Sequence, residues 1–309
     1  MHPALSIIAF TTASGLGYGL AAVLGLGLLD PASVATKIAH FVALALISAG
    51  LLSSTLHLGN PQRAWRALSQ WRSSWLSREG VMAILTFIPL CVAAYGAIFQ
   101  SRYLPVAGLL GTLGAAVTVY CTSMIYASLR SVQAWHTPLT PACYLLFAGA
   151  GGNLLGLFFA VSGGGNALAL SLISVVLLVA AWVVKWQWRK RMLSLVPLST
   201  PESATGLGFI GSVKLFEKPH FNDNYLTSEM GFRVARKHAA KLAWLSVLLG
   251  GVVPVAAVVS LLVSGVGAAS AFAILLAAIA LVSHVIGMLT ERWLFFAEAR
   301  HAVMNYYGQ

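Results

Sequence analysis

Residues 4–29 read ALSIIAFTTASGLGYGLAAVLGLGLL, a run of 26 residues without a charged side chain. An α-helix needs about 20 apolar residues to cross the hydrocarbon core of a bilayer, so this run is long enough to span it. The run is too long for the apolar part of a secretory signal, and residues 1–29 contain no Lys or Arg to form a basic leader. The stretch therefore predicts a transmembrane helix and not a cleavable signal peptide.

Seven similar apolar runs follow in the sequence. Together the predicted spans are 4–29, 36–56, 80–100, 103–129, 139–161, 166–184, 242–265 and 268–290. These runs lack the alternating pattern of membrane β-strands, and a backbone in lipid must satisfy its own hydrogen bonds, which favours helices. We predict an all-α integral membrane protein of eight transmembrane helices. Residues 1–309 form one transmembrane domain, with short links except for a long one between the sixth and seventh helices.

The composition supports a membrane protein and excludes a soluble one. Hydrophobic residues make up 59% of the 309 residues and charged residues only 9%, whereas soluble proteins carry about 25% charged residues. The three cysteines form no CxxC motif or spaced cluster, so the protein is not expected to bind an iron–sulfur cluster or another metal of its own.

The basic residues are distributed unevenly between the two sides of the predicted bundle. Of the 19 Lys and Arg residues, only Lys37 and Arg102 fall on one side, which leaves 17 on the side that carries both termini and the links after the second, fourth and sixth helices. Cytoplasmic loops are enriched in Lys and Arg, so both termini and the basic links are predicted to be cytoplasmic.

Polar residues that could carry chemistry gather on this basic side. His57 closes the second run and Glu79 opens the third, so a single hairpin holds both at the same membrane depth. The fourth run brings Tyr126 and Arg130 to the same face, and Arg63 lies in the hairpin link. A quinone headgroup needs hydrogen-bond donors for its carbonyls and proton-exchanging groups for its redox cycle, and these side chains supply both. We therefore predict a quinone site beside lipid.

Several of these residues have a simpler explanation as ordinary interface residues. The arginines of the hairpin link could act as topology determinants or contacts to anionic lipids; they are Arg63, Arg66, Arg72 and Arg78. Aromatic residues at the same level could form an interfacial belt; they are Trp65, Trp71, Trp75 and Tyr126. His57 and Glu79 could likewise be no more than interface polarity, although such a pair is costly to place beside lipid.

Two histidines lie inside the predicted spans. His40 and His284 could be axial ligands of a haem b, or they could form hydrogen bonds between helices. None of the eight predicted spans has Asp, Glu, Lys or Arg near its middle, which argues against an ion-coupled transporter.

The link at 185–241 is the only extended polar segment. Its residues 216–225 read FEKPHFNDNY, a mixture of aromatic and polar side chains that is typical of an ordered docking surface. Together with the Arg/Trp hairpin link, this segment predicts a surface for a partner protein. The predicted docking residues are Arg66, Arg72, Arg78, Lys218 and His220.

Several short motifs in this sequence resemble one known family. They are MHPALS at 1–6, FTTASGLGYG at 10–19, HLG at 57–59 followed by Pro61 and Arg63-Ala64, and SRE at 77–79. With the eight-span count, they resemble the DMSO reductase membrane anchor (DmsC) family over essentially the whole sequence, and most closely in the first 140 residues.

The resemblance implies a role that depends on partners. Anchors of this family hold a molybdopterin catalytic subunit and a four-cluster iron–sulfur subunit at the bacterial inner (cytoplasmic) membrane. They exchange electrons with quinone or quinol, either menaquinone or ubiquinone, and carry no haem or iron–sulfur cluster of their own. The quinone-site histidine and glutamate of the family match His57 and Glu79 by motif, and Arg63 lies in the matching stretch.

The long 185–241 link departs from the DMSO reductase anchors. It is more similar to the anchors of membrane-bound sulfite-oxidising molybdoenzymes, whose catalytic subunits work in the cytoplasm. The resemblance therefore implies an anchor subunit that is not catalytic by itself. Electrons from sulfite oxidation in the catalytic subunit would pass through it to quinone. The alternatives are a quinol-oxidising anchor of a DMSO or other sulfoxide reductase and a haem b-bearing cytochrome subunit.

Overall fold

The computed structural model describes residues 4–55, 60–214, 216–217, 238–264 and 270–307. Within them, eight helical segments are long and apolar enough to cross a membrane. The first six are α1 (Leu5–Gly25), α2 (Val34–Thr55), α3 (Trp75–Gln100), α4 (Pro105–Ala127), α5 (Leu139–Val161) and α6 (Ala167–Leu193). The seventh span, Ala239–Ser264, joins α8 (Ala239–Val247), η4 (Leu248–Val252) and α9 (Val253–Ser264), and the eighth is α10 (Ala271–Ala297). The described residues contain no β-strand, so the predicted all-α membrane fold is confirmed.

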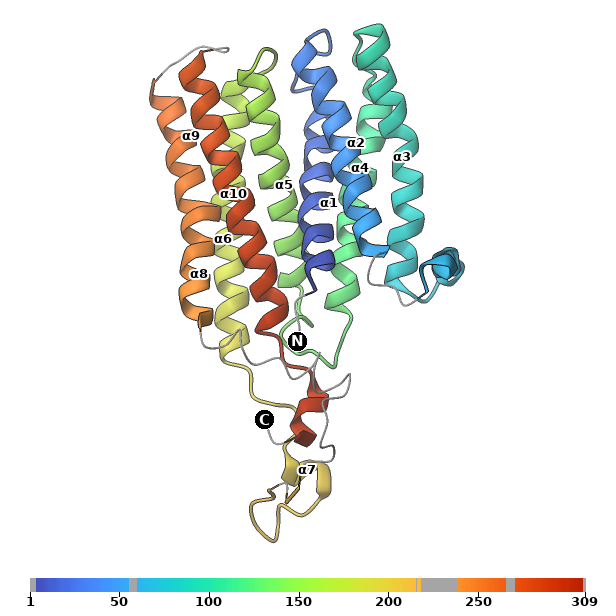
Figure 1. The fold of residues 1–309 in the computed structure, drawn as a ribbon, viewed down its shortest axis with the longest axis vertical. Coiled ribbons are helices and arrows are strands. Elements are labelled where there is room, and N and C mark those ends of the chain that lie inside the picture. The colour runs from blue at the N-terminus through green and yellow to red at the C-terminus, as the bar shows by residue number, and fades with distance from the viewer. Residues whose placement is uncertain (1–3, 56–59, 215, 218–237, 265–269, 308–309) are drawn as a thin grey trace.

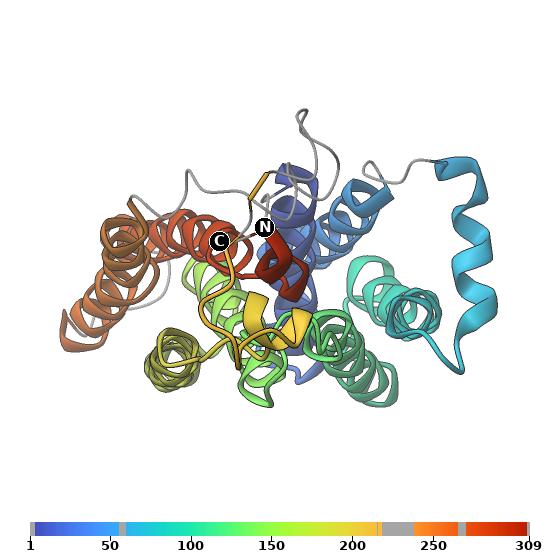
Figure 2. The same ribbon diagram turned by 90° about the horizontal axis from the view of Figure 1, so that it is seen from below.

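The eight spans run side by side along the long axis of the molecule (Figure 1). We call the lower end in that view the basic end; there α1, α3, α5 and α8 begin and α2, α4, α6 and α10 finish. The short helices α7 (Pro201–Thr205) and η5 (Ala302–Tyr307) lie beyond the bundle at this end. Seen from below, η1 (Pro61–Gln70) lies outside the bundle, on the side of α3 (Figure 2).

Helix α1 is central to the bundle. It packs against α2, α4 and α5, while α3 pairs with α4 and α6 pairs with α5. Helix α10 packs between α5 and the seventh span, and it also touches α1. The interior near the basic end is therefore enclosed by α1, α4, α5 and α10.

Three helices extend more than one turn further toward the basic end than the apolar runs predict. Helix α3 begins at Trp75 and not at 80, α6 continues to Leu193 and not to 184, and α10 continues to Ala297 and not to 290. The added turns of α6 and α10 contain Lys, Arg, Gln and Glu, which favour helix and whose long stems can pack on apolar neighbours. The ends of the apolar runs therefore mark where charge begins and not where the helices end.

Helices α1 and α5 approach each other closely at Gly19 and Gly152. A Cβ atom on Gly152 would overlap the Gly19 backbone, and one on Gly19 would overlap the carbonyl of Ala148. Only glycine permits such backbone contact, which is how transmembrane helices gain packing energy where lipid removes the hydrophobic driving force.

The seventh span is interrupted by a π-helical turn, η4, next to Pro254. Proline has no N–H, so carbonyls one turn earlier lose their helical donor. Side chains of α10 replace it: the Ser283 hydroxyl donates to the Leu249 carbonyl, and His284 Nδ1 lies 2.8 Å from the Gly250 carbonyl oxygen. A hydrogen bond between helices is one of the two roles predicted for His284, and this contact between α10 and the seventh span is of that kind.

Candidate functional site

Glu79 lies in the second turn of α3, near the basic end, and only 4% of its surface is exposed. The Thr122 hydroxyl on α4 donates a hydrogen bond of 2.5 Å to Glu79 Oε1. Among the described residues no Lys, Arg or His forms an ion pair with this carboxyl. Because burial of a carboxyl is costly without such partners, its place here indicates a use beyond packing.

Further hydroxyl groups lie around Glu79 between α1, α3 and α4. Thr86 and Thr118 share a hydrogen bond of 3.1 Å across the α3–α4 interface, and both side chains are buried. Tyr18 of α1, also buried, lies close to Thr118 and Glu79. The surroundings of Glu79 inside the bundle therefore include several hydroxyl groups and are not wholly apolar.

Tyr126 lies one turn beyond Thr122 on α4, but it is enclosed and does not lie beside lipid as predicted. Its ring packs against Tyr144 at 5.8 Å and Trp135 at 5.4 Å, and only 9% of its surface is exposed. The indole N–H of Trp135 donates to the Phe295 carbonyl, which fastens the segment after α4 onto α10. These surroundings differ from those of an interfacial belt residue.

Arg78 joins η1 to the start of α3. Its guanidinium donates to the carbonyl oxygens of Trp71 and Arg72 over 3.0 and 2.7 Å, and it lies 4.2 Å from the centre of the Trp75 ring. These contacts commit the Arg78 side chain to the turn between the two helices, whereas docking of a partner was predicted for it.

The remaining predicted residues fall into two groups. The exposed ones at the basic end are Arg63, Arg66, Arg72 and Arg130. Those that lie outside the described residues are His57, Lys218 and His220. The structure therefore brings Glu79 and Tyr126 into one region of the bundle interior, and it leaves four arginines exposed to meet a headgroup or a partner.

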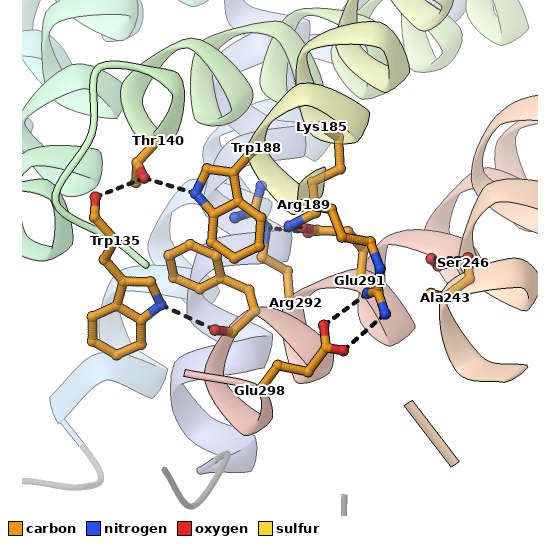
Figure 3. A network of polar contacts seen from close by, with 11 residues as sticks. Trp135, Thr140, Lys185, Trp188, Arg189, Ala243, Ser246, Glu291, Arg292 and Glu298 are labelled. Atoms are coloured by element: carbon orange, nitrogen blue, oxygen red, sulfur yellow. Dashed lines mark hydrogen bonds and ion pairs between the residues drawn. The ribbon is translucent and has the colours of Figure 1, made fainter. Parts of the chain in front are cut away.

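The apolar runs missed a buried ionic cluster between α6 and α10, shown in Figure 3. Lys185 of α6 lies 2.5 Å from Glu291 of α10, and Arg292 Nε lies 3.3 Å from the same carboxylate. All three residues are buried. The predicted spans ended at 184 and 290, so these residues were assigned to links; the structure places them inside helices, which corrects that assignment.

A second ion pair follows toward the basic end. Arg189 makes two hydrogen bonds to the Glu298 carboxylate, at 2.7 and 2.9 Å. Burial raises the pKa of the Glu298 carboxyl, an effect that the Arg189 guanidinium partly offsets. The Lys185/Arg189 spacing of four and the Glu291/Glu298 spacing of seven each return to one helix face, which is the sequence signal that could have revealed the cluster.

His40 and His284, the two candidate haem ligands, line different cavities. His40 lies on α2 beside a cavity of about 10 Å³ near the end opposite the basic end. His284 lines one of about 30 Å³ and is fully buried. Neither cavity has the volume of a porphyrin, and Nδ1 of His284 is already occupied by the Gly250 carbonyl.

Comparisons with known proteins agree with this architecture. The model of the family described as "DMSO reductase anchor subunit (DmsC)" matches residues 1–297. A sulfite dehydrogenase subunit of Allochromatium vinosum is 31% identical, over 99% of this protein and 99% of that one. An anaerobic dimethyl sulfoxide reductase subunit of Escherichia coli is 29% identical, over 45% of this protein and 50% of that one. No solved structure matched the sequence.

Proposed function

Because the chain belongs to the DMSO reductase anchor subunit (DmsC) family, we propose that this multi-pass membrane anchor is the quinone-reactive subunit of a three-subunit molybdopterin oxidoreductase. It passes electrons between a four-cluster iron–sulfur subunit and the quinone pool. The catalytic centre belongs to the molybdopterin subunit, so the anchor alone catalyses no substrate reaction. The complex lies in the bacterial inner membrane, with the basic end and both termini in the cytoplasm.

The observation that carries this proposal is the buried Glu79 carboxyl with its Thr122 partner near the basic end. Reduction of a quinone to a quinol takes up two electrons and two protons. A carboxyl held away from bulk water by a hydrogen bond can give a proton to the quinone oxygen and regain one, which is general acid–base chemistry. In this arrangement His57 donates to a quinone carbonyl, and Arg63 and Arg130, which are exposed at the basic end, bind the headgroup.

Sulfite is the proposed substrate and quinone the proposed electron acceptor. The similarity to the sulfite dehydrogenase subunit extends over 99% of both proteins, whereas that to the dimethyl sulfoxide reductase subunit extends over 45% of this one. The second candidate, a quinol-oxidising anchor of a sulfoxide reductase, is favoured by that shorter match. Assays of the purified complex separate them: sulfite-dependent quinone reduction supports the first, and quinol-dependent sulfoxide reduction the second.

The arginines exposed at the basic end supply a docking surface for the iron–sulfur subunit. Arg66 and Arg72 are exposed, and each guanidinium lies beside a tryptophan ring, Trp65 or Trp71, at 5.6 and 5.4 Å. Arg and Trp are enriched where proteins bind each other. Arg78 contributes by holding the turn that presents them, and the long link adds the basic residues Lys218 and His220 to the proposed docking set.

Replacing Glu79 tests the proposed function. Glu79→Gln keeps the shape and the hydrogen-bonding capacity of the side chain but removes its ability to exchange a proton. We expect quinone-linked turnover to fall about 100-fold or more, the usual contribution of a positioned acid–base group. The molybdenum subunit should keep its activity with an artificial electron acceptor, and the complex should stay on the membrane.

Asp30→Asn is the matched control, because Asp30 is exposed at the end of the bundle opposite the basic end. An amide oxygen can still accept the hydrogen bond that Asp30 Oδ1 accepts from the Ala32 N–H, so turnover should not change. Unchanged quinone turnover in the Glu79→Gln complex would contradict the proposal and favour a purely structural anchor. A reduced-minus-oxidised spectrum of the same wild-type preparation tests the haem alternative, since a haem b band from this subunit would support it.

A further inference from the structure

A small internal cavity lies between α1, α4, α5 and α10, and seven of the residues that line it are polar. Its volume is about 30 Å³, which is room for one or two water molecules. The polar residues that line it are Thr11, Thr12, Ser14, Thr122, Tyr144, His284 and Arg292. An apolar cavity of this size would remain dry, whereas one with several polar partners binds water.

Thr12 Oγ1 and His284 Nε2, two polar atoms in this wall, have no hydrogen-bond partner among the described residues. The Gly250 carbonyl oxygen can only accept, so His284 Nδ1 carries the proton and Nε2 offers a lone pair. The Thr12 hydroxyl can donate or accept. A buried polar atom without a partner costs free energy, and water bound in the cavity would supply the missing partners.

One side of the cavity leads to the proposed quinone site. Thr122 lines the cavity and its hydroxyl is hydrogen-bonded to Glu79. A water molecule in the cavity therefore lies one hydroxyl group away from the Glu79 carboxyl.

The other side of the cavity leads to the ionic cluster of Figure 3. Arg292 lines the cavity, its guanidinium lies 4.0 Å from the centre of the Tyr144 ring, and its Nε contacts Glu291. Glu291 is paired with Lys185. Arg292 therefore stands between the cavity and the buried Glu291 carboxylate.

Beyond this cluster a much larger cleft lies at the basic end. It has a volume of about 520 Å³ and is lined by Arg189, Glu298, Arg300 and His301, among others. Arg189 stands one turn from Lys185 on α6, and Glu298 stands two turns from Glu291 on α10. The two ion pairs therefore lie between the cleft, which Glu298 lines, and the cavity, which Arg292 lines.

We propose that the cavity binds water and forms part of a proton relay from the basic-end cleft to Glu79. Its last steps run from the bound water through the Thr122 hydroxyl, and the ionic cluster of Lys185, Glu291 and Arg292 lies between the cavity and the cleft. The relay rests on the proposed function, because Glu79 must exchange protons with quinone for the relay to have a purpose. A solely structural ionic clamp between α6 and α10 accounts for the salt bridges, but it leaves Thr12 and His284 unexplained.

Protons and electrons balance over each turnover. Each quinone gains two electrons from the iron–sulfur partner and two protons from Glu79, one after the other, and leaves as quinol. After each transfer the Glu79 carboxylate regains a proton from the cavity water through the Thr122 hydroxyl. The water is reprotonated by solvent in the cleft, and for quinol oxidation every transfer runs in reverse.

Thr12 gives the sharpest test, and Thr36 of α2 provides a matched control. The Thr36 hydroxyl is likewise buried without a hydrogen-bond partner among the described residues, but Thr36 does not line this cavity. In the intact complex, Thr12→Val should slow quinone turnover about tenfold, the factor that a lost hydrogen bond gives, and raise its solvent deuterium isotope effect. Thr12→Ser and Thr36→Val should match the wild type in both measurements.

Three results would overturn the relay. An equal loss in Thr36→Val and Thr12→Val would indicate a packing effect, and normal turnover in Thr12→Val would show that the cavity is not used. A high-resolution electron cryomicroscopy map of the wild-type complex that shows a dry cavity would exclude the bound water even if Thr12→Val failed to fold. Loss of turnover in Glu79→Gln together with normal Thr12→Val would reject the relay alone, whereas unaffected Glu79→Gln would reject the proposed function and the relay with it.

Discussion

Thr122 is the residue that couples Glu79 to the rest of the bundle, through a hydrogen bond of 2.5 Å. Thr122→Val keeps the side-chain shape but removes the hydroxyl, so the buried carboxyl loses this hydrogen bond. Hydrogen bonds that involve a charged group contribute about 1.5–3 kcal/mol, so quinone-linked kcat should fall roughly 10- to 100-fold. Steady-state assays of the purified complex with a soluble quinone analogue measure the loss.

Two variants show whether that loss belongs to the hydroxyl. Thr122→Ser restores the donor and should recover most of the activity. Thr112→Val makes the same change on the same helix, but Thr112 bonds the carbonyls of Gly108 and Ala22, far from Glu79 along α4, and turnover should not change. Equal activity in Thr122→Val and wild type would contradict a role for this hydroxyl.

These single residues differ in how well the sequence predicts them. Glu79 is conspicuous because a carboxyl at the start of an apolar run is costly beside lipid, and its burial in the structure agrees with that reasoning. Thr122 carries no such signal, since a threonine within an apolar run is ordinary and its partner is 43 positions away. Lys185 and Glu291 were missed because a charged residue was taken to end each apolar run.

At the scale of the helices, the contact between α1 and α5 depends on Gly152. A methyl group there would overlap the α1 backbone, so Gly152→Ala must push the two helices apart. Overpacking of a tight interface costs about 1–3 kcal/mol, so the thermal unfolding midpoint of the detergent-solubilised protein should fall. Gly149→Ala is the control on the same helix, because its Cβ would meet Leu177 at 3.6 Å, an ordinary contact; an equal fall in both variants would contradict this account.

The number and type of the helices could be predicted from hydropathy alone, because the bilayer thickness sets a minimum length for each span. The internal form of the seventh span could not. Pro254 signals a disturbance, but the π-helical turn η4 and its carbonyl contacts from Ser283 and His284 depend on α10 packing alongside. Hydropathy likewise gives no sign that the polar turns of α6 and α10 continue as helix. The ion pairs that stabilise these turns join residues of one helix to residues of the other, and a hydropathy profile does not show such contacts.

At the scale of the whole molecule, the polar chemistry lies toward one end of the bundle. Glu79, the ionic cluster and the 520 Å³ cleft are all found in the half of the molecule near the basic end. Arg66 and Arg72, two of the three arginines predicted to dock the iron–sulfur subunit, are exposed at the same end. Under the proposed function, electrons and protons therefore reach the quinone from the same side of the membrane.

This arrangement predicts that turnover generates no membrane potential. Oxidation of sulfite with water gives sulfate, two protons and two electrons, and reduction of quinone takes up two of each. Both proton exchanges occur at the basic end, so no charge crosses the bilayer.

The prediction can be tested in liposomes that contain the complex and quinone. Sulfite added outside drives only complexes whose catalytic subunit faces outward, and a potential-sensitive dye should respond no more than it does with an ionophore present. A co-reconstituted proton pump provides the positive control. A dye response that the ionophore abolishes would place the proton exchange of the quinone at the opposite face, and it would reject both the Glu79 site and the relay from the basic-end cleft.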